Sequence, residues 1–309
     1  MGYMMLQAME TGKVHLLPGL FAERAEVNRA YLMELENQGL LQNFYLEAGI
    51  IMPGLQVVED PETALLHWGW EAPTCQLRGH FLGHWMSAAA KLVAATGDVE
   101  LKAKLIKIVD ELEKCQKLNG GQWIGPIPEK YFKKLEREEY IWSPQYVMHK
   151  TLLGLMHAYQ YAGIDQALAI LDGISDWYVD WVKDMEVKNP HAVYSGEEGG
   201  MLEVWATLYE LTGEEKYRNL AKAYDHPSIF RKLEEGKDAL TNCHANASIP
   251  WAHGAAKMYE ITGDDRWKKL AEDFFRFAVT ERGTYCTGGL SVSFYRKGRV
   301  RRLYRKKSL

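Results

Sequence analysis

Hydrophobic residues recur at helical spacing along much of the chain. The segment MLEVWATLYEL (201–211) and the following EKYRNLAKAY (215–224) place apolar residues near positions i, i+3, i+4 and i+7. The same spacing occurs in PWAHGAAKMYEI (250–261) and DRWKKLAEDFFRFAVTER (265–282). Each pair of segments therefore predicts two amphipathic helices joined by a short corner.

A short turn motif follows the first helix of each pair. It reads AATGD, QYAGID, LTGEE or ITGDD. The glycine of the motif suits a left-handed helix C-cap, and the acidic residue that follows suits the start of the next helix. The chain is therefore predicted to contain four helical hairpins, with corners at Gly97, Gly163, Gly213 and Gly263.

The two helices of a predicted hairpin differ in composition. The first is rich in Ala, Gly and aromatic residues, as a helix buried on both sides would be, whereas the second has a Lys/Glu face that suits solvent. Such repeats bury a continuous core by stacking, and closure into a ring gives an all-α (α/α) toroid. A closed ring needs more hairpins than these, even with one or two helices from residues 20–48. We expect an incomplete toroid, with an open superhelix as the alternative.

No low-complexity linker divides the chain. We therefore predict one toroid domain over residues 1–289, followed by a basic tail at 290–309. The one obvious long loop is NGGQWIGPIP (119–128), whose glycines permit unusual backbone angles. This loop is expected to cover a ligand-binding mouth.

The composition is that of an ordinary globular protein, with 47% apolar and 25% charged residues. The net charge of -4 hides an asymmetry, because residues 296–309 hold eight Lys/Arg and no acid, which leaves 29 bases against 41 acids elsewhere. An acidic body repels phosphate backbones, so no nucleic-acid partner is expected. Motifs of the GxGxxG, GxxxxGK[ST], GxSxG and HExxH types are missing from the sequence, which removes the simplest support for dinucleotide, P-loop, α/β-hydrolase and zincin chemistry.

The four cysteines, Cys75, Cys115, Cys243 and Cys286, show no CxxC pair and no tight metal spacing. They are expected to be reduced and mostly buried. The sequence shows neither a signal-peptide pattern at its start nor an apolar run long enough for a bilayer, so we expect a cytoplasmic protein with no membrane partner.

Polar and aromatic side chains gather at the starts of the predicted inner helices, where a toroid has its pocket. In RGHFLGHW, His80 and His84 share one face at i, i+4 spacing, which could bind zinc if a third ligand converged. Hydrogen bonding to the backbone or to neighbouring helices is the alternative. In YIWSPQYVMHK, Trp142, Gln145 and His149 form a composition that suits stacking on a sugar and bonding of its hydroxyls. Helix packing is the alternative role for these residues.

Two later helix starts carry further candidates. In SGEEGGMLE, Glu198 could cap a helix or, facing a pocket, act as acid, base or acceptor for a sugar hydroxyl. Glu203 lies one turn further along the same helix, so these two carboxylates cannot flank one glycosidic bond from opposite faces. In LTNCHANASIPWAH, His244 and Asn246 could bond a sugar ring, whereas His253 is expected to pack against other helices.

Taken together, these phrases resemble the β-L-arabinofuranosidase group, glycoside hydrolase families 127 and 146. The resemblance covers residues 14–289 and runs through GWE, LRGHFLGHWMSAAA, EEGGMLEVWATLYELTGE, HANASIP and YCTGG. It implies a toroid followed by a β-rich region, and hydrolysis of β-L-arabinofuranosides with retention of configuration. The residues that match family phrases, and are therefore expected to bind the sugar, are His80, His84, Trp142, His149, Glu198, His244 and Asn246.

The mechanism that the resemblance implies uses a zinc-bound cysteine thiolate as nucleophile and a glutamate as acid/base, with the metal held by a glutamate and further cysteines. Aligned on the GlyGly pair of YCTGG, the glutamate position falls at Phe294, and the sequence has no acid after Glu281 and no cysteine after Cys286. We therefore expect the chain to break off before its catalytic end, with 290–309 an out-of-frame or otherwise aberrant terminus. No cofactor is expected in this chain, although the family uses zinc.

The expected partner is an arabinose-containing oligosaccharide or glycan of plant type. Because an unfinished ring exposes the apolar flank of its last hairpin, a homo-oligomer is also expected. Two other functions suit a helical toroid. One is a different toroid enzyme, such as a sugar epimerase that uses paired histidines, with His149 and His244 as candidates, or an unsaturated-glucuronide hydrolase. The other is a non-catalytic helical-repeat protein that binds a glycan or a protein partner.

Overall fold

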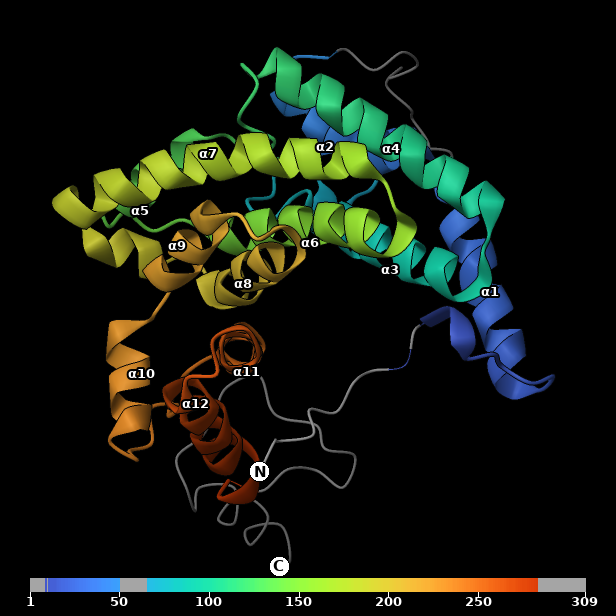
Figure 1. Ribbon diagram of the computed structural model, residues 1–309. Coiled ribbons are helices and arrows are strands. Elements are labelled where there is room, and N and C mark those ends of the chain that lie inside the picture. Colours follow the sequence, from blue (N-terminus) through green and yellow to red (C-terminus); the bar gives the residue numbers. More distant parts are fainter. Residues whose placement is uncertain (1–8, 10, 51–65, 283–309) are drawn as a thin grey trace, which may run out of the picture. The chain divides into compact units, whose positions relative to one another are not determined.

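The computed structural model describes residues 9, 11–50 and 66–282 (Figure 1). Within this part of the chain every regular element is helical, and no strand occurs. The longer helices are α1 (Leu20–Glu34), α2 (Asn37–Glu47), α3 (His80–Thr96), α4 (Val99–Leu118), α5 (Lys130–Glu136), α6 (Pro144–Ala162), α7 (Asp165–Lys188), α8 (Met201–Thr212), α9 (Glu215–Ala223), α10 (Pro227–Glu234), α11 (Ala245–Thr262) and α12 (Asp265–Phe275).

Short helical turns link these helices. They are η1 (Thr11–Lys13), η3 (Gly69–Glu71), η4 (Pro190–Tyr194), η5 (Glu198–Gly200) and η6 (Arg276–Thr280), the last being a π-helical turn. The prediction of an all-α protein is confirmed over the described residues. None of the described helices is both long enough and apolar enough to cross a membrane.

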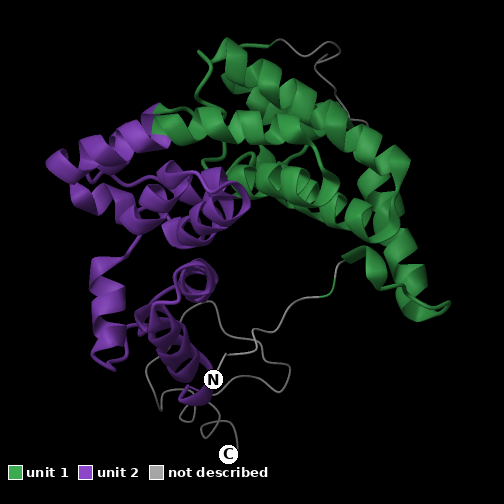
Figure 2. Ribbon diagram, viewed as in Figure 1, with its two compact units in different colours: residues 1–129, 150–177 green, residues 130–149, 178–309 purple. Residues whose placement is uncertain are grey.

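The chain divides into two compact units (Figure 2). Unit 1 contains residues 1–129 and 150–177, and unit 2 contains residues 130–149 and 178–309. Helices α6 and α7 each contribute to both units. Unit 1 thus holds the α3–α4 hairpin, whereas unit 2 holds the α8–α9 and α11–α12 hairpins.

All four predicted corners are left-handed glycines. The φ angles of Gly97, Gly163, Gly213 and Gly263 are 73°, 65°, 75° and 69°. This conformation carries little strain for glycine, which has no Cβ. The four sites are therefore the hairpin corners that the sequence predicts.

The acidic residue after a corner caps the next helix in two cases. The side chain of Asp98 accepts hydrogen bonds from the backbone amides of Glu100 and Leu101, and that of Asp264 accepts one from Arg266. Glu214 occupies the same position before α9 without a side-chain capping bond. Asp has the short side chain that N-caps prefer, which explains the difference between these corners.

In the α8–α9 hairpin the inner and outer helices differ as predicted. The outer helix α9 buries a single stripe, formed by Tyr217, Leu220 and Ala221. The inner helix α8 is covered nearly all round, with the following residues buried: Met201, Leu202, Val204, Trp205, Ala206, Thr207 and Leu208. A helix that is apolar on all sides must lie inside its unit.

Glycine allows the inner helices to approach each other closely. In unit 1, a Cβ on Gly83 of α3 would lie 2.0 Å from the Lys150 carbonyl oxygen of α6. In unit 2, a Cβ on Gly254 of α11 would lie 2.7 Å from Cγ of Leu202 in α8. Both distances are too short for a real Cβ, so the glycines are needed where neighbouring hairpins stack.

The second half of the loop at 119–128 is buried. Trp123, Ile124 and Ile127 are buried in unit 1, and the two isoleucines are fully covered. The loop also packs against α3, because a Cβ on Gly79 would lie 2.1 Å from Pro126. Residues 123–127 therefore pack into unit 1, whereas residues 120–122 are exposed, and a role of the loop in covering a ligand-binding mouth stays a prediction.

Candidate functional site

Each inner helix is preceded by a residue with left-handed backbone angles. The four residues and their φ angles are Gly79 at 84°, Ser143 at 51°, Glu197 at 62° and Asn242 at 69°. Three of these residues are not glycine, and such a conformation costs about 1–3 kcal/mol each. The three stand within two residues of the predicted sugar-binding residues Trp142, Glu198 and His244. Backbone strain of this kind is concentrated at functional sites in proteins.

Glu198 is the most buried carboxyl among the predicted site residues, with 6% of its surface exposed. It lies in unit 2, in the turn η5 just before α8. The indole Nε1 of Trp251 donates a hydrogen bond of 3.2 Å to its Oε1 atom. Nε2 of His226 lies 3.8 Å from the same oxygen. One carboxyl oxygen of Glu198 is therefore held between two aromatic side chains from α11 and from the start of α10.

Burial changes the charge state of this group. It raises the pKa of Glu198 from 4.5 to about 7, against the smaller opposing effect of hydrogen bonds from its own backbone amide and from Trp251. Burial likewise lowers the pKa of His226 to about 4. The 3.8 Å contact therefore joins a neutral imidazole to a carboxyl that is half ionised near pH 7. Glu198 can both donate and accept a hydrogen bond in the neutral pH range.

Aromatic rings continue outward from this carboxyl. The rings of His226 and Trp251 are 5.2 Å apart in an edge-to-face arrangement, and those of Tyr194 and His226 are 5.1 Å apart. All three side chains are partly exposed. A row of rings beside a buried carboxyl can bind the apolar face of a sugar while the carboxyl bonds a hydroxyl. We call Tyr194, Glu198, His226 and Trp251 the Glu198 cluster.

The GlyGly pair after Glu198 is explained by packing. A Cβ on Gly199 would lie 2.1 Å from the Ala247 carbonyl oxygen in α11, so η5 rests on the first turns of that helix. A Cβ on Gly200 would lie 2.3 Å from Cε1 of His149. The buried imidazole of His149 thus packs directly against the backbone of η5. The structure brings two predicted site residues, His149 and Glu198, to the two ends of one three-residue turn.

The side chain of Gln145 forms hydrogen bonds within the protein. Its fully buried amide donates hydrogen bonds to the carbonyl oxygens of Val193 at 3.0 Å and Ser195 at 2.6 Å, and its Oε1 accepts one from Tyr224 at 2.7 Å. The prediction that this amide bonds sugar hydroxyls is therefore wrong. Gln145 instead fixes the loop that leads into η5 and so positions Glu198.

The remaining predicted site residues of unit 2 are more exposed to solvent than Glu198. Trp142 is half-buried directly before the strained Ser143. His244 is the N-cap residue of α11 and is also half-buried, whereas Asn246 in the first turn is exposed. His253 is exposed rather than packed, and its Nδ1 lies 3.7 Å from Oε2 of Glu203, which explains why an Ala-rich helix tolerates it.

His80 and His84 lie in unit 1, at the start of α3. Nδ1 of His80 lies 2.7 Å from Oε1 of Glu71 and 3.1 Å from the Leu77 carbonyl oxygen. The rings of His80 and His84 are 5.9 Å apart, edge to face. Partial desolvation and the nearby Lys150 ammonium lower the pKa of His84, so its exposed ring is neutral at pH 7.

A zinc site is not formed by the described residues, since no group of three His, Cys, Asp or Glu side chains there could hold a metal ion. The i, i+4 pair of His80 and His84 thus lacks the third ligand that a zinc site needs. Of the cysteines, Cys115 is a buried free thiol, and Cys75 and Cys243 are half-buried free thiols. Cys286, the position at Phe294 and the basic tail lie outside the described residues.

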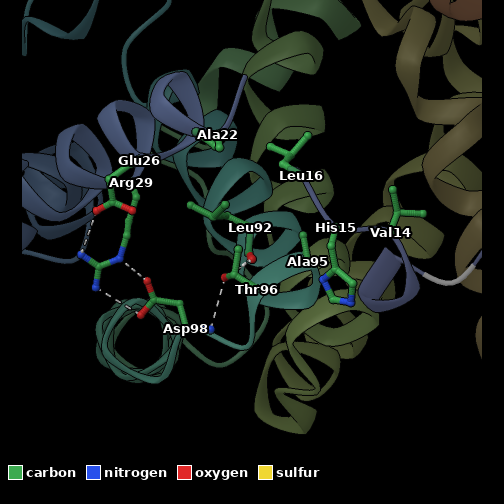
Figure 3. A pocket seen from close by; sticks show the side chains of 11 residues that line it. Val14, His15, Leu16, Ala22, Glu26, Arg29, Leu92, Ala95, Thr96 and Asp98 are labelled. Atoms are coloured by element: carbon green, nitrogen blue, oxygen red, sulfur yellow. Dashed lines mark hydrogen bonds and ion pairs between the residues drawn. The ribbon is translucent and has the colours of Figure 1, made fainter. Parts of the chain in front are cut away.

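A pocket of about 550 Å³ lies in unit 1, between η1, α1 and α3 (Figure 3). Its one cation, Arg29, is bonded to Asp98 and to Glu100, and Asp98 also caps α4. The remaining lining is mainly apolar and includes Leu16 and Leu92. The pocket contains none of the predicted sugar-binding residues, and its Arg29 and Asp98 are already paired with each other.

Sequence reasoning missed Tyr194, His226 and Trp251. Trp251 stands two turns after His244 on one face of α11, a spacing visible in the sequence. His226 precedes Pro227 at the start of a short helix, which is a common helix-start pattern and carries no functional signal by itself. Only the tertiary structure brings these residues to Glu198.

Stacked helical hairpins whose inner helices begin at left-handed residues are consistent with the (α/α)-toroid class of fold. The family described as "Beta-L-arabinofuranosidase, GH127 catalytic domain" matches residues 13–301. The chain belongs to this family. The resemblance to glycoside hydrolase family 127 is thereby confirmed.

Among solved structures, the chain is similar to a GH127 β-L-arabinofuranosidase from Geobacillus stearothermophilus T6, with a TM-score of 0.60 and 17% sequence identity. The match covers 90% of this chain and 46% of that enzyme, so the chain spans less than half of its length. At this identity the likeness shows the fold alone, and it agrees with the predicted toroid class. A comparison with curated proteins gave no match.

Proposed function

We propose that this chain recognises β-L-arabinofuranosyl groups of glycans through the Glu198 cluster. The observation that carries the proposal is the burial of Glu198 against Trp251 and His226 in a member of the GH127 family. A carboxyl with a pKa of about 7 can exchange hydrogen bonds with two sugar hydroxyls, one as donor and one as acceptor. The rings beside it supply the apolar contact that a sugar ring also needs.

The other family-matching residues extend this proposal. His149 touches the far end of η5 from Glu198, and it is the predicted residue best placed to share a ligand with the cluster. His80, His84, Trp142, His244 and Asn246 are proposed as further sugar contacts on the strength of their match to family phrases. For these 309 residues the proposal concerns recognition of the sugar, and cleavage is the family activity that must be measured separately.

Binding of methyl β-L-arabinofuranoside tests the proposal by isothermal titration calorimetry. The Glu198→Gln variant should lose at least about tenfold in affinity, because a hydrogen bond to a charged or ionisable group contributes roughly 1.5–3 kcal/mol. Glu203→Gln is the matched control, since this carboxyl lies on the same stretch of chain but is paired with His253. Equal affinities in the wild type and the Glu198 variant, or no binding by the wild type, would contradict the proposal.

Two further assays separate the alternative functions. Release of p-nitrophenol from p-nitrophenyl β-L-arabinofuranoside, with and without added zinc, reports cleavage. Exchange of solvent deuterium into a free sugar reports the epimerase, which would have to depend on His149 and His244. Saturable binding without either reaction identifies a non-catalytic glycan-binding protein.

A further inference from the structure

His226 reaches Glu198 from α10, a short helix that lies outside the four hairpins. It is the N-cap residue of α10, and its side chain makes no capping bond. A helix of eight residues is too short to be stable by itself, so tertiary contacts must fix its position. Within unit 2, α10 packs against α12, the outer helix of the following hairpin. The position of the imidazole beside Glu198 therefore depends on how α12 holds α10.

A single side chain of α12, that of Arg266, bonds both ends of α10. Its Nη1 and Nη2 atoms each donate a hydrogen bond of 2.8 Å to the carboxylate of Asp225, the residue directly before His226. Its Nε donates to Glu234, the last residue of α10. Two parallel bonds between a guanidinium and a carboxylate fix the orientation of the two groups as well as their distance. Arg266 thus fixes the start of α10 relative to α12.

The residue on the other side of Asp225 is held by a different part of unit 2. The hydroxyl of Tyr224 donates a hydrogen bond of 2.7 Å to Oε1 of Gln145, whose amide fixes the loop before η5. That loop includes Tyr194, whose ring is 5.1 Å from the ring of His226. Tyr224 itself is buried. The backbone is therefore anchored at both residues that precede His226, and each anchor is a side chain of another element.

The contact that these anchors control is at the limit of a hydrogen bond. Nε2 of His226 lies 3.8 Å from Oε1 of Glu198, whereas a direct bond needs about 3.2 Å or less. The two side chains are 13% and 7% exposed, so the imidazole is part of what keeps water from the carboxyl. A shift of α10 by only about 1 Å would change both the contact and the access of water.

We propose that Arg266 is a positioning residue of the Glu198 cluster, which acts through Asp225 to hold His226 beside the Glu198 carboxyl and so increases the affinity of the cluster for its sugar. The inference rests on the proposed function for the nature of the ligand. The side chains of Arg266 and Asp225 are each 34% exposed, and ion pairs with this exposure contribute little to stability. What the site gains from the pair is its two-bond geometry.

Two substitutions of Arg266 separate geometry from charge. Arg266→Gln removes both, whereas Arg266→Lys keeps the charge but cannot form the two parallel bonds. Lys269→Gln is the matched control. Lys269 lies one turn further along α12, and its Nζ donates to the carbonyl oxygens of Leu233 at 3.3 Å and Glu234 at 3.1 Å, at the end of α10 away from His226. Circular dichroism checks that each variant remains helical, and Arg266→Lys decides the test if Arg266→Gln does not fold.

The pKa of Glu198, measured by carbon-detected NMR, reports on the position of His226 without any ligand. In both Arg266 variants it should fall from about 7 towards 4.5, because a loosened imidazole admits water to the carboxyl. Loss of a positive charge without movement would instead raise this pKa. Lys269→Gln should leave it unchanged. A fall is therefore a signature that a purely structural ion pair would not give.

Calorimetry with methyl β-L-arabinofuranoside measures the consequence for binding. Both Arg266 variants should bind about threefold to tenfold more weakly than the wild type, and Lys269→Gln should bind equally well. The double variant Arg266→Gln/Asp225→Asn should bind no more weakly than Asp225→Asn alone, because Arg266 acts through Asp225.

The positioning role is overturned if the pKa of Glu198 is unchanged or raised in the Arg266 variants, or if it falls equally in Lys269→Gln. Additive losses of affinity in the double variant would overturn the route through Asp225. If the wild type does not bind the arabinofuranoside while the pKa of Glu198 falls in both Arg266 variants, the proposed function fails and the control of His226 by Arg266 stands. If the wild type binds and that pKa does not fall, the positioning role fails alone.

Discussion

The indole of Trp251 donates its single N–H to Oε1 of Glu198 across 3.2 Å, which links two residues 53 positions apart in the sequence. Indole nitrogen can only donate, so this oxygen must act as an acceptor whether or not the carboxyl is ionised. The contact favours the ionised form, while burial disfavours it more strongly. The balance between the two effects gives specific consequences for stability and titration.

Glu198 should make the protein more stable in mild acid. Its folded-state pKa of about 7 lies above the ordinary value of 4.5, so the folded protein keeps this proton to higher pH than the unfolded chain does. The stabilising effect is complete below pH 4.5 and is lost as the pH rises through 7. Its full size is about 3 kcal/mol. Glu198→Gln cannot ionise, so relative to wild type it should gain about this much stability between pH 4.5 and pH 8.

Urea unfolding of wild type and Glu198→Gln at pH 4.5, 6 and 8 measures this difference directly. Glu203→Gln is the control, because the Glu203 side chain is 37% exposed. A stability difference between wild type and the Glu198 variant that does not change with pH would show that Glu198 titrates at an ordinary pKa.

Trp251→Phe should raise the pKa of Glu198 further. The substitution keeps an aromatic ring but removes the N–H that stabilises the carboxylate, so ionisation becomes harder. The titration can be followed by carbon-detected NMR of the side-chain carboxyl, with Glu198→Gln used to assign the signal. Trp267→Phe is a suitable control, because this buried residue of α12 packs against Phe230. An unchanged or lower Glu198 pKa in Trp251→Phe would mean that the indole does not stabilise the charge.

The hairpin corners could be predicted because their causes are local. A glycine that ends one helix and an Asp that caps the next are neighbours in the sequence, as at Gly263 and Asp264, and both act within one turn. The inner and outer helices of the α8–α9 hairpin were also predictable, since burial all round or along one stripe is visible in the residue pattern of a single helix.

The site could be predicted only in part, because its residues meet through tertiary contacts. Glu198 was identifiable as a carboxyl at a helix start, but its partner His226 comes from a separate short helix. The amide of Gln145 shows the opposite problem. Its position among aromatic residues suggested a sugar ligand, yet which groups an amide bonds depends on the segments that pack on it. Here its nitrogen bonds carbonyl oxygens of the loop before η5, and its oxygen bonds the Tyr224 hydroxyl.

Replacing Glu197 with glycine should stabilise the fold. Glu197 has a φ of 62°, which glycine adopts without the steric cost that a side chain brings. Relief of that strain should raise the free energy of unfolding by about 1 kcal/mol. Part of this gain is offset, because glycine has more conformational entropy than glutamate in the unfolded chain. Glu214→Gly is the matched control, since Glu214 is likewise an N-cap residue without a side-chain capping bond but has an ordinary φ of -75°.

Chemical denaturation of the two glycine variants gives the comparison. Glu214→Gly should lose stability, by about 0.5–1 kcal/mol, because only the unfolded-state effect operates there. If Glu197→Gly loses as much as Glu214→Gly, the left-handed conformation at Glu197 is not strained, and the link between strain and the Glu198 site fails.

Gly200 and His149 should show strong energetic coupling. Any Cβ at position 200 would lie 2.3 Å from Cε1 of the buried imidazole, and neither η5 nor α6 can move without disturbing its core contacts. Gly200→Ala should therefore cost about 1–3 kcal/mol of stability, as overpacking does elsewhere. In the double variant Gly200→Ala/His149→Ala the imidazole that clashes with the new Cβ has been removed. Gly200→Ala should therefore lower the free energy of unfolding much less in the His149→Ala background than in the wild type. A coupling energy near zero in this double-mutant cycle, measured by urea unfolding, would show that His149 does not pack against η5 in solution.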